Sequence, residues 1–257
     1  AYGVSPGFFS LATTHIPVDR RADLQRSLVR SHAAGSGPPV EAEVVRAMQL
    51  LRLRTLATGR TGARPQTAQA IADLLNAGVT PAVAEYGSLG CSGDLAPLAA
   101  CALVLMGEGE VLADDGVTRP SADALRAAGI APITLAEKEG LALLNGTDGM
   151  LGMLVLAIED LGRLVTTADL AAAMTVEALL GTDRVFAADL VRLRPQPGQA
   201  ISAANLRTLL DGSSIVASHA GPEDTRVQDA YSLRCAPQVA GACRDTIEPA
   251  RRVASYE

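Results

Sequence analysis

The chain has 257 residues, of which 48% are hydrophobic but only 3% aromatic, and this composition suits helices that pack closely on one another. A net charge of −6 and the lack of a basic run in the sequence argue against nucleic-acid binding. The four cysteines form no CxxC pair, as is typical of a reduced, cytoplasmic protein, and the longest apolar run, Met150 to Ile158, is too short to cross a bilayer.

Most of the chain has the spacing of apolar residues that is typical of amphipathic helices. We expect helices over 19–32, 41–58, 65–77, 94–106, 121–128 and 134–143. Several have an acidic residue or a Pro near the start, or a Gly near the end. The last of them begins with the capping-box pair Thr134 and Glu137. Residues 110–118 are the clearest β segment, because Asp115-Gly116 favours a hairpin turn between two short apolar stretches.

A longer helix is predicted from Asp148 to Leu180, with Gly152 and Gly162 as small residues inside it. Its length of about 33 residues corresponds to roughly 50 Å at about 1.5 Å per residue. The short neighbouring segments cannot cover its apolar faces. We therefore expect a helical bundle that is completed by other subunits.

The most unusual stretch is the glycine-rich segment from Gly87 to Asp94, which precedes a predicted helix. A phosphate-binding loop is one interpretation, but the Lys-Ser/Thr ending of that motif is missing. A nucleophile elbow requires Gly-x-Ser-x-Gly after a strand, and the spacing here differs. A plain helix N-terminus capped by Asp94 is also compatible with these residues.

The segment from Gly87 to Leu98, GSLGCSGDLAPL, is similar to the signature of the histidine and aromatic amino-acid ammonia-lyase family. Further matches at 2–4, 145–149 and 226–234 extend the resemblance along nearly the whole chain. The resemblance implies a cofactor, methylidene-imidazolone (MIO), formed from Cys91-Ser92-Gly93, and no metal or nucleotide. On this interpretation the Gly93 nitrogen attacks the Cys91 carbonyl, and Ser92 loses water to become the methylidene group. Glycine suits the close backbone approach that this cyclisation requires.

The same resemblance assigns roles to residues in the other matching segments. Tyr2 resembles the base that removes the β-proton, although a residue so near a chain end is also prone to fray. Asn145 resembles the residue that binds the MIO ring and the substrate, and it also suits a helix C-cap. Gln228 and Tyr231 resemble groups that line the site. Arg234 resembles the clamp on the substrate carboxylate, but without the family it would be assigned to the surface.

The pair Ser31-His32 resembles the residues that face the substrate side chain in histidine-specific members of the family. The resemblance therefore implies that His32 is a substrate-binding residue. Without the family, a lone His near a helix end is simply a partner of the helix dipole. The sequence departs from the family pattern at Pro6, Phe9, Ala100 and Ala240.

The fold that the resemblance implies is mainly α and ammonia-lyase-like, with a small β-hairpin. We expect an MIO-containing domain over 1–147 and the first part of a long central helical bundle over 148–257. Family members are much longer, and the chain is similar to their N-terminal half. We therefore expect it to assemble with other copies of itself and with a second chain that supplies the remaining half, as a cytoplasmic protein without a membrane or nucleic-acid partner.

The implied activity is MIO-dependent elimination of ammonia from L-histidine, or from a related small amino acid, as in histidine catabolism to urocanate. Two alternatives remain at this stage. An aminomutase would use the same cofactor but return the amine to the β-carbon. A non-catalytic paralog or structural subunit would keep the fold without the reaction.

Overall fold

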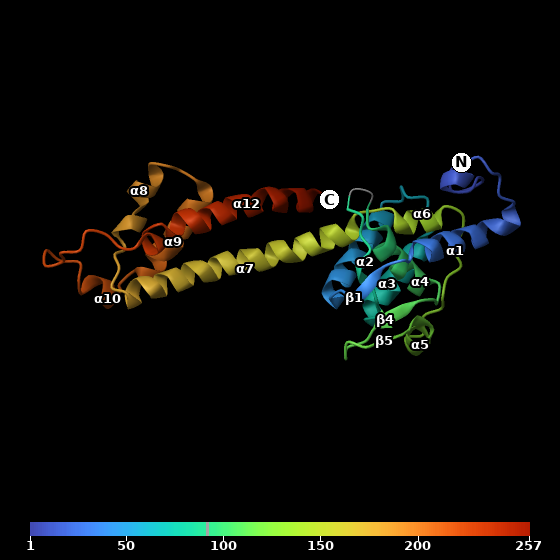
Figure 1. Ribbon diagram of the computed structural model, residues 1–257, viewed down its shortest axis with the longest axis horizontal. Helices are drawn as coiled ribbons and strands as arrows, with labels where there is room; N and C mark the ends of the chain where they lie inside the picture. The colour runs from blue at the N-terminus through green and yellow to red at the C-terminus, as the bar shows by residue number, and fades with distance from the viewer. Residues whose placement is uncertain (91–92) are drawn as a thin grey trace. The chain divides into compact units, whose positions relative to one another are not determined.

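The computed structural model describes residues 1–90 and 93–257, and Cys91 and Ser92 lie outside the described residues. The chain divides into two compact units, Ala1–Met153 and Leu154–Glu257. The boundary between them falls inside one continuous helix, α7 (Asp148–Ala178), which Figure 1 shows in yellow and yellow-green. The predicted helix over 148–180 is therefore confirmed, with its end at Ala178.

The first unit is mainly helical and contains two short turns of 3-10 helix. Its elements are η1 (Phe9–Leu11), η2 (Val18–Arg20), α1 (Arg21–His32), α2 (Ala42–Ala57), α3 (Pro65–Ala77), α4 (Leu95–Leu105), α5 (Ser121–Ala127), α6 (Glu139–Leu144) and the start of α7. The helices predicted over 19–32, 41–58, 65–77, 94–106 and 121–128 are confirmed to within two residues at each end. Pro65 at the start of α3 and Gly78 in the left-handed conformation at its end explain why that helix was predictable to the residue.

The prediction of a helix from Thr134 to Leu143 is wrong at its start, because α6 begins only at Glu139. Lys138 adopts a φ of +76°, which interrupts a helix, and its N–H donates to the Gly3 carbonyl at 2.8 Å. The buried Glu139 carboxylate accepts hydrogen bonds from Arg64 at 2.7 Å, Thr67 at 2.6 Å and the Ala136 N–H at 2.7 Å. These tertiary contacts override the local capping signal.

Short antiparallel strands accompany the helices of the first unit. β4 (Glu110–Leu112) and β5 (Thr118–Pro120) form the predicted hairpin, and β2 (Thr80–Pro81) pairs with the other edge of β4. β1 (Ser36–Pro39) pairs with β3 (Ala84–Tyr86), and the sequence did not predict this pair. The sequence Ser-Gly-Pro-Pro has no apolar alternation, so β1 is defined by its partner rather than by its own residues.

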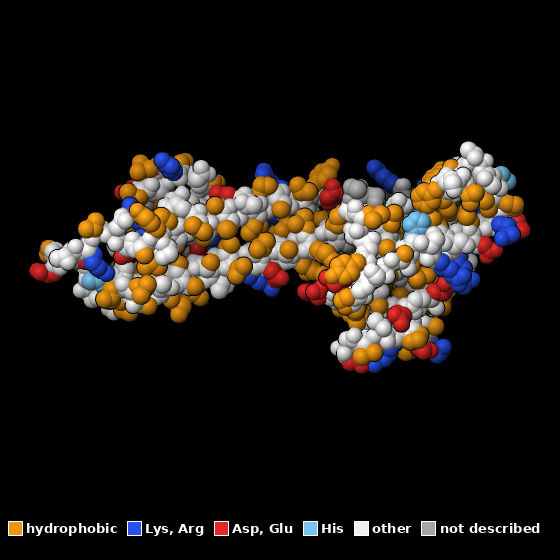
Figure 2. All heavy atoms as spheres, in the orientation of Figure 1, with side chains coloured by type: hydrophobic (Ala, Val, Ile, Leu, Met, Phe, Trp, Pro, Cys, Tyr) orange, Lys and Arg blue, Asp and Glu red, His pale blue; other side chains and the backbone are white. Residues whose placement is uncertain are grey.

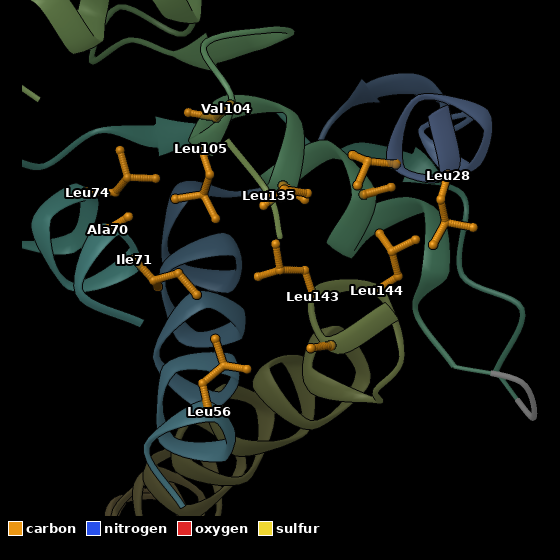
Figure 3. Packing of buried hydrophobic residues seen from close by; sticks show 14 of the residues in the cluster. Leu28, Leu56, Ala70, Ile71, Leu74, Val104, Leu105, Leu135, Leu143 and Leu144 are labelled. Atoms are coloured by element: carbon orange, nitrogen blue, oxygen red, sulfur yellow. The ribbon is translucent and has the colours of Figure 1, made fainter. Parts of the chain in front are cut away.

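Aliphatic side chains from α1, α3, α4 and α6 form the core of the first unit. Figure 3 shows Leu28, Leu74, Leu105 and Leu144 among the side chains that fill the space between these helices. Burial of a Leu or Ile side chain contributes about 1.5–3 kcal/mol, so this cluster stabilises the scaffold that holds the loops described below.

The second unit consists of the rest of α7, two further long helices and several short elements. These are η3 (Arg184–Phe186), α8 (Ala188–Arg192), α9 (Pro197–Leu210), α10 (Ser214–Ala217), α11 (Tyr231–Arg234) and α12 (Ala236–Tyr256). The buried Asp169 of α7 binds α9 through Asn205 at 2.7 Å and α12 through Arg244 at 2.7 Å. One carboxylate thus fixes the packing of three helices.

Large apolar side chains remain exposed along α7 and α12 in this chain. Leu164 is 61% exposed, Met174 63% and Val239 67%, and Figure 2 shows hydrophobic side chains along this part of the chain. The stretch Glu139–Ala178 is apolar and long enough to cross a membrane, with a mean hydropathy of 1.7, and less than half of its most apolar part is buried. This is weak evidence for a membrane span, because a core helix of a soluble protein has the same length and composition.

Candidate active site

The glycine-rich loop before α4 is tied to the N-terminus of α7 through Asp94. The Asp94 carboxylate is buried, with one oxygen accepting from Ser88 Oγ at 2.6 Å and the other from the Met150 N–H at 3.0 Å. Asp94 is the N-cap residue of α4, as the alternative interpretation of the sequence expects, but its side chain makes no cap hydrogen bond to that helix. It satisfies a free N–H of α7 instead, where a negative charge also complements the helix dipole.

Two loops of the first unit meet backbone to backbone at Gly93 and Gly146. The Asp94 N–H donates to the Gly146 carbonyl at 2.7 Å. Gly93 has a φ of +96°, and a Cβ at this position would lie 2.6 Å from the Gly146 carbonyl oxygen. Glycine is therefore required at position 93 both by conformation and by the closeness of the opposing chain. The other two members of the predicted MIO tripeptide, Cys91 and Ser92, lie outside the described residues.

A buried ion pair supports the Gly146 side of this contact. Arg52 of α2 pairs with Asp148, the first residue of α7, and also donates to the Ala142 carbonyl at 3.0 Å. Any side chain at Gly146 would collide with the Arg52 guanidinium. Sequence reasoning missed Arg52, although it stands in the apolar stripe of α2 with Val45, Met48 and Leu56, and a charge in such a stripe indicates a buried partner.

Asn145, predicted to bind the cofactor and substrate, follows the last residue of α6. Its side-chain amide donates to the Leu141 carbonyl at 3.0 Å, which is a C-cap interaction within the helix it ends. The side chain is exposed, and the next residue is Gly146. The structure therefore brings Asn145 and Gly93 to the same pair of loops.

Tyr2 and His32 are brought together by a residue between them, Phe9. The Tyr2 hydroxyl accepts from the Phe9 N–H at 3.3 Å, and the Phe9 ring stacks on the His32 imidazole with a centroid distance of 5.6 Å. His32 Nδ1 lies 2.9 Å from the Leu28 carbonyl oxygen and 3.0 Å from Ser31 Oγ. Because a carbonyl oxygen only accepts, we assign the proton to Nδ1, which leaves Nε2 as an acceptor.

The position of Tyr2 depends on the carbonyl of the next residue, Gly3. That carbonyl accepts from the Lys138 N–H at 2.8 Å and from Gln25 Nε2 at 3.4 Å, while Gln25 Oε1 accepts from the Gly140 N–H at 2.9 Å. Gln25 is fully buried and thereby ties the Tyr2 loop to α6, the helix that leads to Asn145. Sequence reasoning missed Gln25. Among the described residues, no hydrogen bond joins Tyr2 or His32 to Gly93 or Asn145.

The remaining predicted site residues lie in the second unit. Arg234 Nη1 donates to Gln228 Oε1 at 2.9 Å, and both residues line a cavity of about 230 Å³ together with Arg226 and His219. Arg226 is paired with Asp224, and this hydrogen-bonded pair lowers the pKa of Asp224 to about 2. Tyr231 begins α11 and is 70% exposed. An arginine fork held at one nitrogen suits a planar anion such as a carboxylate.

No metal site is evident in the part of the chain that the structure describes, because no group of three or more His, Cys, Asp or Glu residues there is placed to hold an ion.

Comparison with known proteins gives a consistent match over the whole chain. The family model described as aromatic amino acid lyase matches residues 1–257. The chain is 63% identical over 256 residues to a histidine ammonia-lyase of Streptomyces coelicolor, covering 100% of this chain and 50% of that protein. It thus spans about half the length of the curated relatives it matches.

Solved structures show the same fold. A tyrosine aminomutase from Streptomyces globisporus matches with a TM-score of 0.88 and 40% identity, over 98% of this chain and 51% of that one. A histidine ammonia-lyase from Trypanosoma cruzi matches with a TM-score of 0.83 and 38% identity, over 96% of this chain and 44% of that one. The expected mainly helical, ammonia-lyase-like fold is confirmed.

Proposed function

Because the chain belongs to the aromatic amino acid lyase family, we propose that the protein containing it eliminates ammonia from L-histidine. The observation that carries this proposal is the backbone contact between Gly93 and Gly146, which leaves no room for a side chain at position 93. Formation of MIO from Cys91-Ser92-Gly93 requires such a bare, tightly bent backbone at the third residue. The MIO group supplies the electrophile that turns the substrate amine into a leaving group.

The chain's own residues supply the remaining steps of this proposal. Tyr2 removes the β-proton, and the Phe9 N–H holds its hydroxyl oxygen in place while the ring remains 46% exposed and accessible. Asn145 orients the substrate next to the glycine-rich loop. Arg234, oriented by Gln228, binds the substrate carboxylate through its remaining donors, and Tyr231 lines the site.

His32 supports the choice of histidine as substrate. Its Nδ1 proton is directed to the Leu28 carbonyl, so Nε2 offers a lone pair to the substrate side chain. An imidazole N–H can donate to that lone pair, whereas a phenyl ring cannot. The relatives named histidine ammonia-lyase agree with this choice.

We also propose that residues beyond this chain complete the site. The chain spans half of its relatives' length, and α7 and α12 expose apolar side chains such as Leu164 and Val239. Such surface is typical of helices that are covered by other parts of an assembly. The covering elements on this proposal are further copies of the chain and the segment that corresponds to the rest of the relatives.

The intact mass of the purified whole protein tests the cofactor proposal. A mass lower by two water molecules than the sequence predicts, restored by Ser92→Ala, would show that the tripeptide has cyclised. Ser92→Ala should also abolish formation of urocanate, whereas the matched exposed-serine variant Ser10→Ala should not. An unmodified native mass together with no turnover would favour a non-catalytic subunit.

A second candidate is an aminomutase, which the match to the tyrosine aminomutase structure favours. Both reactions use the same proposed cofactor and base, so the mass measurement does not separate them. Product analysis does, because an aminomutase returns a β-amino acid whereas a lyase releases ammonia and an unsaturated acid.

A further inference from the structure

Phe9 has an unusual backbone for a residue with a large side chain. Its φ of +51° is in the left-handed region, which residues with a Cβ seldom occupy. Its ring is 63% exposed, so burial in the core does not account for this conformation. An unfavourable conformation persists only where surrounding contacts enforce it.

Two contacts of Phe9 provide that enforcement, and each reaches a residue of the proposed site. The backbone N–H binds the Tyr2 hydroxyl oxygen at 3.3 Å, and the ring lies on the His32 imidazole at an interplanar angle of 23°. The loop is closed below Phe9 by hydrogen bonds from the Gly7 N–H to the Thr14 carbonyl and from the Ile16 N–H to the Ser5 carbonyl. Phe9 therefore lies between Tyr2, the proposed base, and His32, the proposed specificity residue, and contacts both.

The stacking also decides how His32 can be approached. One face of its imidazole is covered by the Phe9 ring, and Nδ1 is directed to the Leu28 carbonyl. The hydrogen bonds of His32 to the described residues all involve Nδ1, and Nε2 accepts hydrogen bonds but donates none in this tautomer. A phenyl group therefore cannot stack on the face that Phe9 covers, whereas a side chain that offers a donor in the plane of the ring, as an imidazole does, can bind Nε2.

We propose that Phe9 is a specificity-determining residue that covers one face of His32 and so makes the site select side chains with an N–H donor over hydrocarbon rings. This inference rests on the proposed ammonia-lyase function. It assigns a role in substrate choice to a residue that contacts both Tyr2 and His32.

Three substitutions at position 9 separate the ring from the backbone. Phe9→Gly removes the ring, keeps the N–H that binds Tyr2 and fits the left-handed conformation, so it is not expected to unfold the loop. Phe9→Tyr keeps a stacking ring, and Phe9→Leu keeps apolar bulk without an aromatic face. Val18→Ala, at a 70% exposed position of η2, is the control for general changes near the loop.

The first measurement is the NMR chemical shift of the His32 ring protons in the whole protein, assigned by their loss in His32→Gln. A stacked ring shields these protons, so Phe9→Gly and Phe9→Leu should move them downfield, whereas Phe9→Tyr and Val18→Ala should not. An unchanged shift in Phe9→Gly would overturn the inference. This readout needs no turnover and is therefore independent of the proposed function.

The second measurement is the ratio of kcat/KM for histidine to kcat/KM for phenylalanine. Phe9→Gly should lower this ratio by about tenfold, the scale of one aromatic pair, and Phe9→Tyr should restore it. If the wild-type enzyme is active and Phe9→Gly has the same ratio as the wild type, the role of Phe9 is overturned but the proposed function is not. A wild-type protein without any turnover would overturn the proposed function, and this role of Phe9 with it.

Discussion

Replacement of Gly93 by Ala tests whether the crossing of two backbones constrains the proposed site. The new Cβ would lie 2.6 Å from the Gly146 carbonyl oxygen, and φ would have to stay near +96°. The left-handed conformation costs about 1–2 kcal/mol for a residue with a Cβ. Displacing the Gly146 carbonyl would leave the N–H of the buried Asp94 without its partner, at about 1–3 kcal/mol. The expected loss in the free energy of unfolding is therefore about 2–5 kcal/mol.

Urea denaturation of Gly93→Ala measures this loss, and Gly78→Ala is the matched control. Gly78 also has a positive φ, +69°, but no atom lies within 4 Å of the position of its Cβ. The control should therefore show only the conformational part, about 1–2 kcal/mol. Equal losses in the two variants would refute the argument, because they would mean that the Gly146 carbonyl places no steric demand on position 93. The intact mass of Gly93→Ala should in addition equal that of an uncyclised chain.

Three further predictions concern buried groups of the same unit. Asp148→Leu should lower the free energy of unfolding by about 3–5 kcal/mol because it leaves the Arg52 guanidinium buried and unpaired, and Arg52→Met in the same chain should recover most of that loss in urea denaturation. Burial opposes ionisation of Glu139, but hydrogen bonds from a guanidinium, a hydroxyl and backbone N–H groups outweigh it and hold its pKa below the ordinary 4.5. The unfolded state therefore binds more protons than the folded state, so this carboxylate stabilises the fold above about pH 4.5 and ceases to do so as the pH falls through its folded pKa. Glu139→Gln should weaken the acid dependence of the thermal midpoint, and an unchanged dependence would contradict this. Burial, assisted by the charge of Asp148, raises the pKa of Cys101 to about 12, so iodoacetamide at pH 8 should alkylate Cys101 much more slowly in the native protein than in the protein unfolded in urea, and similar rates in the two states would argue against it.

The helices were predictable where the apolar periodicity agrees with residues that start or end a helix. The helix α3 begins at Pro65 and stops at Gly78, and both signals lie within the helix itself or next to it. The prediction of where α6 starts failed because the residues that determine it are remote in sequence. The Lys138 N–H donates to the Gly3 carbonyl, and the Glu139 carboxylate accepts from Arg64. Strand β1 was not predicted for the same reason, since only its pairing with β3 makes it a strand.

The sequence motifs pointed to candidate site residues, but the buried residues that hold the loops of the site were not predicted. Family resemblance supplied Tyr2, His32 and Asn145, and these residues bear polar or aromatic groups that stand out in a sequence. Gln25 and Arg52 resemble ordinary polar positions on helices. A sharper use of periodicity would have singled them out, because Gln25 shares the buried face of α1 with Leu28 and Val29. What the sequence cannot indicate is the identity of their distant partners.

The contact between the glycine-rich loop and the α6–α7 connection depends on backbone atoms rather than on side chains. Gly93 and Gly146 supply close approach, the Asp94 N–H binds the Gly146 carbonyl, and the Arg52 guanidinium occupies the space beside Gly146. A cofactor made from the backbone needs a carbonyl from position 91 but no particular side chain there, so a Cys at this position is chemically acceptable. The same reasoning makes glycine indispensable at position 93, and it places the strictest steric demands of the proposed site at residues that carry no functional group.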